Sequence, residues 1–258
     1  MLSSQNVSQK FDKQRPPTTH VNMPFSISPV EADDVDQLIR RIQYPTHQSN
    51  PLTLLMFPHS RNEIRPEHRE REIQWEIDGL LDTVHRGDEI LYKACGIDGS
   101  PVGLIGWTHS PGTFSKTTGK DTRSSHATSG GSRTVMDDPP TLDVTAWLQV
   151  SRKLRDERQR VLQGYQGKGI CRITFMAVDP EYQRQGIGTM LMELFCRQID
   201  EKSLDAFVLS SPAGIRLYTK FGFKQAGAVE TTQGAFISLL RSGSEVQERM
   251  YNIISSKE

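Results

Sequence analysis

The chain has 258 residues, of which 35% are hydrophobic and 24% are charged, and its 31 basic and 31 acidic residues give a formal net charge of zero. This length predicts one large domain or two small ones, and the composition is typical of a water-soluble globular protein with some unpacked polar segments. A neutral chain gives no support to non-specific binding of nucleic acid or of an anionic membrane. A membrane-spanning helix is not expected, because no run of about eighteen apolar residues occurs.

The N-terminus and the cysteines favour a cytoplasmic protein, with the nucleus not excluded. Residues 1–22 are polar and lack the apolar core of a secretory signal, so we expect a disordered arm there. Cys95, Cys171 and Cys196 lie far apart, without the close spacing of a zinc site or a disulfide framework. We therefore expect reduced cysteines and no metal. Cys171 and Cys196 could suggest an acyl-cysteine intermediate, but their apolar surroundings in the sequence favour small core residues.

The first half of the chain predicts a strand and two helices. Residues 25–30 are strand-like, and 31–45 have acidic residues early and arginines later, as a helix dipole favours. We expect Pro45 to end this helix. Residues 64–87 place apolar side chains at helical spacing, with Gly87 as the C-terminal cap.

A hairpin and a long polar segment follow. Residues 89–96 and 101–109 are strand-like on either side of an Asp-Gly turn, which is a hairpin pattern. Residues 110–141 are rich in Ser, Thr and Gly, and we interpret them as a flexible insertion within one domain. The charged segment 142–164 is predicted to be helical.

The second half predicts alternating strands and helices. Strands are expected at 170–178, 205–211, 223–230 and 234–242. One amphipathic helix begins near Ile187, and a shorter one begins at Ser211 as N-cap and ends at Gly222. The prediction is a single domain over 23–241, with a tail at 242–258.

The junction between the strand ending at Val178 and the helix at Ile187 is unusual, because glycine at a helix start costs conformational entropy. Gly186 and Gly188 would let a ligand approach the main chain, where free N–H groups and the helix dipole favour phosphate oxygens. Arg184 could add charge. A tight packing turn is the alternative, and the spacing fits neither a Walker motif nor a dinucleotide-binding motif.

Two regions in order along the chain resemble the GNAT superfamily of acyl-CoA-dependent N-acyltransferases. The first region matches through Val178, Asp179, Pro180, Gln183, Gly186 and Gly188, and the second through Leu217, Tyr218, Gly222 and Phe223. The closer match covers about 170–240. The resemblance implies an α/β (α+β) fold with a mixed, mostly antiparallel central sheet flanked by helices. In such a fold a splayed strand pair forms the CoA notch.

The resemblance also implies a binding site for acetyl-CoA. Main-chain groups of the strand would hold pantetheine, the glycine-rich turn would hold pyrophosphate, and a residue after the next strand would touch CoA. The implied cofactor-binding residues are Met176, Ala177, Val178, Gln183, Arg184, Gln185, Gly186, Ile187, Gly188, Thr189 and Ser211. Ser211 stands where relatives often have Asn. Tyr218 occupies the position of the catalytic acid that protonates the leaving thiolate.

The general base is not carried over, since the strand at 170–178 contains no carboxylate where many relatives have one. An alkylammonium must lose a proton before it can attack a thioester. Candidates are a chain of water molecules, Glu67, Glu76 and Asp143. Each of these carboxylates also fits a solvated helix position.

The sequence therefore predicts an N-acetyltransferase that uses acetyl-CoA as co-substrate and no metal, with direct attack by a primary amine. A small-molecule acceptor is favoured. Protein lysine or N-terminal acetylation, and a catalytically degenerate acyl-CoA-binding module, are the alternatives. We expect no nucleic-acid or membrane partner, and a monomer or a homodimer.

Overall fold

The computed structural model describes residues 25–47, 50–58, 64–111, 138–163 and 169–243. The predicted N-terminal arm, most of the polar insertion and nearly all of the C-terminal tail lie outside these residues. The two ends of the insertion are described: residues 110–111 complete a strand, and 138–141 lead into a helix.

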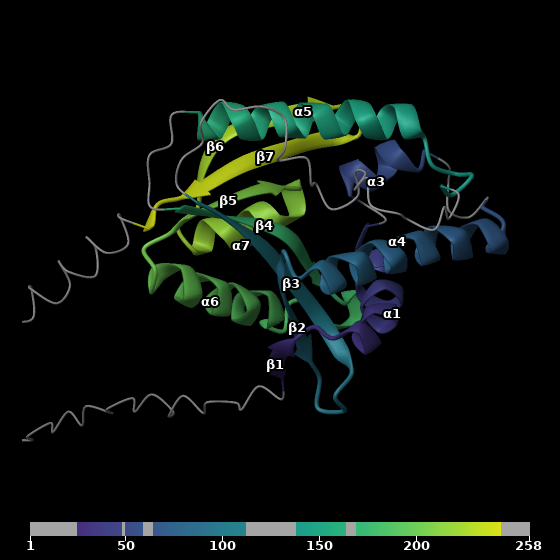
Figure 1. Ribbon diagram of the computed structural model, residues 1–258, viewed down its shortest axis with the longest axis horizontal. Helices are drawn as coiled ribbons and strands as arrows, with labels where there is room; N and C mark the ends of the chain where they lie inside the picture. The colour runs from purple at the N-terminus through teal and green to yellow at the C-terminus, as the bar shows by residue number, and fades with distance from the viewer. Residues whose placement is uncertain (1–24, 48–49, 59–63, 112–137, 164–168, 244–258) are drawn as a thin grey trace, which may run out of the picture.

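One sheet of seven strands runs through the described residues in the order β1-β2-β3-β4-β5-β7-β6. The strands are β1 (Ser26–Pro29), β2 (Ile90–Cys95), β3 (Pro101–Pro111), β4 (Gly169–Val178), β5 (Asp205–Ser210), β6 (Lys224–Thr231) and β7 (Gly234–Arg241). All neighbouring pairs are antiparallel except β4 and β5, which are parallel. The predicted mixed, mostly antiparallel sheet is confirmed, and Figure 1 shows the helices that flank it.

The helices agree with the sequence pattern in most places. They are η1 (Ala32–Asp34), α1 (Val35–Gln37), η2 (Leu38–Gln43), α2 (Tyr44–Thr46), α3 (Pro51–Met56), α4 (Pro66–Arg86), α5 (Val144–Leu162), η4 (Pro180–Tyr182), α6 (Ile187–Asp200), η5 (Pro212–Gly214) and α7 (Ile215–Lys220). Gly87 ends α4 with a φ of 63°, as a glycine C-cap does. Helix α3 was not predicted; it begins where the Asn50 side chain accepts a hydrogen bond from the Leu52 N–H at 2.9 Å.

The prediction that Pro45 ends the first helix was wrong, since helical structure continues to Thr46. In a regular α-helix the Pro45 ring would clash with the carbonyl four residues earlier. Here η2 is a π-helical stretch, and the Tyr44 N–H donates to the Ile39 carbonyl five residues back. The wider turn relieves the clash. Such turns occur frequently at functional sites.

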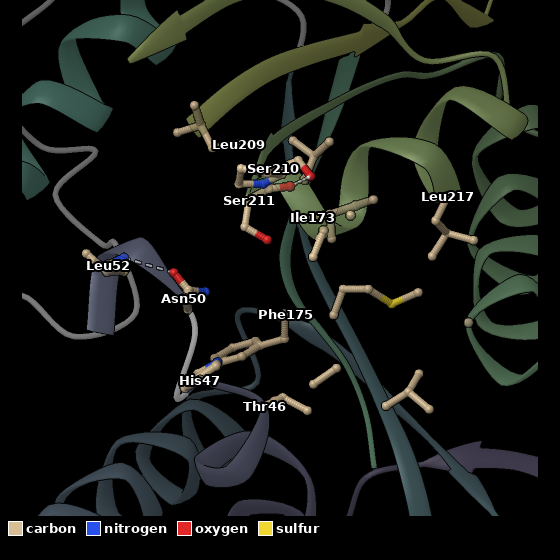
Figure 2. A pocket seen from close by; sticks show the side chains of 18 of the residues that line it. Thr46, His47, Asn50, Leu52, Ile173, Phe175, Leu209, Ser210, Ser211 and Leu217 are labelled. Carbon is tan, nitrogen blue, oxygen red and sulfur yellow. Dashed lines mark hydrogen bonds between the residues drawn. The ribbon is translucent and has the colours of Figure 1, made fainter. Parts of the chain in front are cut away.

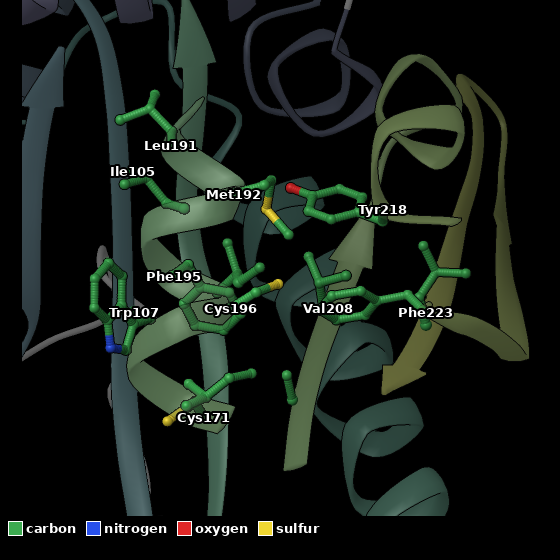
Figure 3. Close-up of a cluster of buried hydrophobic side chains, with 14 of the residues drawn as sticks. Ile105, Trp107, Cys171, Leu191, Met192, Phe195, Cys196, Val208, Tyr218 and Phe223 are labelled. Atoms are coloured by element: carbon green, nitrogen blue, oxygen red, sulfur yellow. The ribbon is translucent and has the colours of Figure 1, made fainter. Parts of the chain in front are cut away.

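Two apolar layers cover the two faces of the sheet. Successive β3 side chains point to opposite faces, so Leu104 packs with η2 and α4 while Ile105 and Trp107 pack with α6. Figure 3 shows the α6 layer, in which the Trp107 and Phe195 rings meet edge to face with centroids 5.2 Å apart. The helix that follows the glycine-rich turn is thus fixed against the centre of the sheet.

A β-bulge changes which β4 side chains face each layer. Gly106 pairs with Phe175 and Trp107 pairs with Ile173, so Thr174 is an extra residue in β4. Ile173 lies in the α6 layer, whereas Phe175, two residues later, lies in the α4 layer. A regular strand would place both on one face.

Strands β4 and β5 separate after a short pairing. They pair at only three positions, from Ile170 with Asp205 to Arg172 with Phe207. Beyond these positions β4 continues to Val178 and β5 to Ser210 without pairing to each other. The predicted splayed strand pair is therefore present; we call the gap between these strand ends the notch.

Helix α5 is fixed on β7 by Glu157, whose carboxylate is buried and accepts hydrogen bonds from Arg160 at 2.7 and 2.8 Å and from Ser238. The hydrogen bonds from Arg160 are the main cause that lowers the pKa of Glu157. A carboxyl group with a lowered pKa stabilises the fold above its unfolded-state pKa of about 4.3, and this contribution is lost as the pH falls through the folded pKa.

We expect Glu157→Gln to remove about 1 kcal/mol of unfolding free energy at neutral pH and to flatten its decline below pH ~4.3. Urea unfolding between pH 7 and pH 3 measures both effects. Glu193→Gln, at an exposed position of α6, is the control. Parallel pH curves for the wild type and Glu157→Gln would show that this carboxylate does not contribute.

Candidate active site

A cavity of about 1490 Å³ extends across the notch. One end is lined by the loop 183–189 and α7, and the other by α2, α3 and α4, with β4 and β5 between them. Figure 2 shows Phe175 of β4 between the two ends, with His47 and Asn50 on one side and Ser211 and Leu217 on the other. The cavity therefore joins two chemically different regions.

The loop 183–189, which we call the phosphate loop, is built around two residues with left-handed backbone conformation. Arg184 has a φ of 66° and Gly186 a φ of 93°, and Gly186 is the N-cap of α6. The Gln183 side-chain amide donates to the Val178 carbonyl at 3.2 Å and so ties the loop to the end of β4. Left-handed residues beside a helix start direct N–H groups into one concavity, which suits an anion.

Positive side chains lie at this end of the cavity. Arg184, Arg216 and Lys220 all contribute to its lining, and the Lys220 ammonium donates to the Thr189 hydroxyl at 3.4 Å. Together with the N–H groups at the start of α6, these charges can bind phosphate groups.

The residues predicted to bind the cofactor gather around this region. Those that line the cavity are Met176, Ala177, Val178, Gln183, Arg184, Gly186, Ile187, Gly188, Thr189 and Ser211. Gln185 does not line it, and its side chain donates to the Glu181 carbonyl at 3.2 Å. Ser211 is the N-cap of η5, but its side chain makes no capping hydrogen bond. Their ligand roles remain predictions.

Tyr218 projects from α7 into the same cavity and is buried. Its ring meets Phe223 edge to face, with centroids 5.6 Å apart. Burial raises the pKa of the Tyr218 phenol well above its ordinary value, so the hydroxyl is a proton donor at neutral pH. Gly214 allows this packing, because a Cβ there would lie 3.0 Å from the tyrosine ring and 2.7 Å from the Ser210 hydroxyl.

Of the three carboxylates considered as a base, only Glu76 lines the cavity. Asp143 instead caps α5 by accepting a hydrogen bond from the Ala146 N–H at 2.8 Å. Glu67 is exposed in the first turn of α4 and faces Arg65 at 3.8 Å. The solvated-helix interpretation therefore holds for Glu67 and is wrong for Glu76, which is only 5% exposed.

Glu76 lies among polar groups that sequence reasoning missed. His47 Nδ1 is 3.8 Å from Glu76 Oε1, and Gln43 also lines the cavity. No local motif marks Gln43 or His47. They reach the cavity because the first helix continues through Pro45.

The cysteines do not belong to this site. Cys171 and Cys196 pack in the α6 layer, and burial raises the pKa of each thiol to about 11. A protonated thiol is a poor nucleophile, which favours the interpretation as small core residues.

Within the described ranges, no helix is long and apolar enough to span a membrane. The same residues contain no group of three or more His, Cys, Asp or Glu side chains placed to hold a metal ion.

The protein is an α/β protein whose sheet opens between two parallel strands, and the cavity across this opening is lined by a glycine-rich helix start. A helix start of this kind can bind phosphate groups. Residues 145–225 match the family model described as "Acetyltransferase (GNAT) domain". This match includes both motifs, and the resemblance inferred from them is confirmed for this part of the chain.

Part of the chain is similar in sequence to a curated acetyltransferase, and its fold is similar to that of solved acetyltransferases. The chain is 38% identical over 55 residues to the [Ribosomal protein bS18]-alanine N-acetyltransferase of Escherichia coli strain K12; the match covers 20% of this chain and spans 37% of that protein's length. Arylalkylamine N-acetyltransferase 2 from Aedes aegypti is similar in structure, with a TM-score of 0.56, 10% identity, and coverage of 84% of this chain and 98% of that one.

A Corynebacterium glutamicum structure described as histone acetyltransferase HPA2 and related acetyltransferase gives a TM-score of 0.53 at 11% identity, over 85% of this chain and 97% of that one. At these identities the two structures agree with the present one in fold.

Proposed function

We propose that the protein is an acetyl-CoA-dependent N-acetyltransferase that transfers acetyl directly to a primary amine. The observation that carries the proposal is a single cavity that joins a positively charged phosphate loop, across the notch, to the buried carboxylate of Glu76. One end suits the donor phosphates, and the other suits a cationic acceptor.

The donor would bind along the phosphate loop and β4. The N–H groups from Arg184 to Thr189, with Arg216 and Lys220, would hold the pyrophosphate. Beyond Arg172, β4 does not pair with β5, so main-chain groups at Met176 and Val178 are proposed to pair with the pantetheine amides. Ser211 would contact CoA from the opposite side of the notch.

The proposed reaction is nucleophilic acyl substitution. The acceptor ammonium loses a proton toward Glu76, and the neutral amine attacks the thioester carbon. A main-chain N–H near Val178 would stabilise the oxyanion. The C–S bond then breaks, the thiolate takes the Tyr218 proton, and the attacking nitrogen gives its second proton to the resulting Tyr218 phenolate. The products are an N-acetyl amine and CoA, and the proton taken by Glu76 passes to solvent. The phenol, kept protonated by burial, supports this role for Tyr218.

A small-molecule acceptor is proposed because α3 packs against α5 and β7 at the acceptor end of the cavity. A Cβ at Gly234 of β7 would lie 3.3 Å from the Pro51 ring, which shows how closely α3 approaches the sheet. The match to a ribosomal-protein alanine N-acetyltransferase favours a protein N-terminus as the second candidate. A degenerate CoA-binding module is disfavoured, since both Tyr218 and Glu76 line the cavity.

Gly186 provides the first test. Isothermal titration with acetyl-CoA should give micromolar binding to the wild type and loss of binding by at least about 100-fold in Gly186→Glu, because a carboxylate there repels phosphate. Gly186→Ala is the matched control: it carries the same backbone strain at φ 93° without the charge, and it should bind at least tenfold more tightly than Gly186→Glu. CoA release in an amine panel then reports turnover. A wild type that binds no acetyl-CoA would refute the proposal.

A further inference from the structure

Two buried oxygen atoms at the acceptor end have no hydrogen-bond partner among the described residues: Gln43 Oε1 and Glu76 Oε2. The residues are 1% and 5% exposed, and both line the cavity. Leaving a buried acceptor unsatisfied costs free energy, and native proteins rarely do so without a reason. Two such acceptors in one cavity indicate a ligand that donates several hydrogen bonds there.

The charge of this end favours a cation. Glu76 is the acidic side chain among the described residues that line the cavity, whereas Arg184, Arg216 and Lys220 belong to the phosphate end. A second buried carboxylate, Glu72, lies one turn earlier on α4 and accepts hydrogen bonds from the Tyr44 hydroxyl at 3.0 Å and from the Thr141 hydroxyl at 2.6 Å. Since two nearby carboxylates repel each other, a positive ligand beside Glu76 is stabilising.

The walls around these polar atoms are apolar. Apolar side chains from α3 and its C-cap, α4, α5 and β7 line the cavity here. They are Leu52, Met56, Phe57, Trp75, Leu154 and Phe236. Trp75 meets Phe57 edge to face with centroids 6.2 Å apart, and Trp147 meets Trp75 at 5.9 Å, so this wall is a packed aromatic group. This aromatic wall favours a ligand whose part beyond the ammonium is apolar over a ligand that carries a second charge there.

We propose that Gln43 and Glu76 form the acceptor subsite, and that the acceptor is a primary ammonium attached to an apolar alkyl or arylalkyl body with no second charge. The ammonium donates to Glu76 Oε2 and to Gln43 Oε1, and the body lies against the aromatic wall. The subsite deepens the proposed function and rests on it for the reaction, but binding of the ammonium is a separate property that can be measured without turnover.

The test is isothermal titration of 2-phenylethylammonium chloride into the CoA-saturated protein. The wild type should bind it, Glu76→Gln should bind at least about 50-fold more weakly, and Gln43→Met about tenfold more weakly, since each loses a hydrogen bond to a charged donor. Glu67→Gln, exposed on the same helix, should bind as the wild type does. Gln43→Met removes an unsatisfied buried oxygen at similar volume, so it should fold even if Glu76→Gln does not.

Comparator ligands test the class of acceptor. 2-Phenylethanol, which lacks the ammonium, and spermidine, which carries further charges, should each bind at least tenfold more weakly than 2-phenylethylammonium. Tighter binding of spermidine, or of a short peptide through its N-terminus, would overturn the apolar single-charge class. Equal binding by the wild type and both subsite variants would overturn the subsite.

The two proposals fail differently. If acetyl-CoA binds but no ammonium binds in a Glu76-dependent way, the subsite is wrong and the donor half of the proposed function stands. If CoA does not bind, the same titration into the free protein decides: ammonium binding that depends on Glu76 and Gln43 supports the subsite while the proposed function fails.

Discussion

Replacement of Tyr218 by phenylalanine is expected to lower kcat for acetyl transfer by about 10²–10³-fold, because the thiolate would then leave without a general acid. The dissociation constant for acetyl-CoA should change by less than about twofold, since the ring and its contact with Phe223 are retained. Steady-state kinetics and calorimetric titration on the same preparations separate these two effects.

The pH dependence of the wild type sharpens this prediction. Burial raises the pKa of Tyr218, so the phenol stays protonated at pH values below that raised pKa. We therefore expect no decline of kcat attributable to Tyr218 between pH 6 and pH ~10. If kcat does decline over this range and the decline disappears in Tyr218→Phe, the assignment of Tyr218 as an acid that is protonated before each turnover would be contradicted.

Tyr182→Phe is the matched control. Tyr182 is half-buried on η4, meets Phe25 edge to face at 6.3 Å, and does not line the cavity. Removal of the Tyr182 hydroxyl should change kcat by less than about twofold relative to the wild type. If both variants slow transfer equally, the effect reflects general packing rather than acid catalysis at Tyr218.

The position of the proposed donor residues around one cavity could be predicted, because their sequence signals are local. Gly186 and Gly188 stand at a helix start in the sequence, and the structure gives Gly186 the positive φ that such a start requires. Gly188 is also needed for packing, since a Cβ there would lie 3.3 Å from Leu217 of α7. The ligand and packing interpretations of this turn are therefore compatible, as both depend on the missing side chains.

The acceptor half could be predicted only at Glu76, which was one of three candidate carboxylates, because this half is assembled from segments that are distant in sequence. Gln43 and His47 lie at the end of the first helix, and Glu76 lies on α4. Pro45 normally predicts a helix end, and only the π-helical turn before it carries the helix onward. The Thr174 bulge likewise has no sequence signal, because it depends on the register with β3.

The second large effect concerns the support of α7. Arg241 is 5% exposed, donates to both Asp200 oxygens at 2.6 and 2.8 Å, and donates through Nε to the Phe221 carbonyl at the end of α7. Asp200→Ala would leave this guanidinium buried without its carboxylate. We expect the unfolding free energy to fall by about 3–5 kcal/mol and Tm by about 10 °C, measured by urea and thermal unfolding.

An exposed ion pair is the appropriate control for this partly buried ion pair, in which the Asp200 side chain is 26% exposed. Asp36 is 2.9 Å from Arg40, but the Asp36 side chain is 61% exposed, so Asp36→Ala should cost less than about 1 kcal/mol. If Asp200→Ala lowers the unfolding free energy no more than Asp36→Ala does, then the Arg241 guanidinium is solvated well enough without the Asp200 carboxylate. The position of Tyr218 would then depend on the packing of α7 against Phe223 rather than on the ion pair. A large loss would instead show that α7, which carries the proposed acid Tyr218, depends on a contact between the end of α6 and the last strand, outside both motifs that carry the family resemblance.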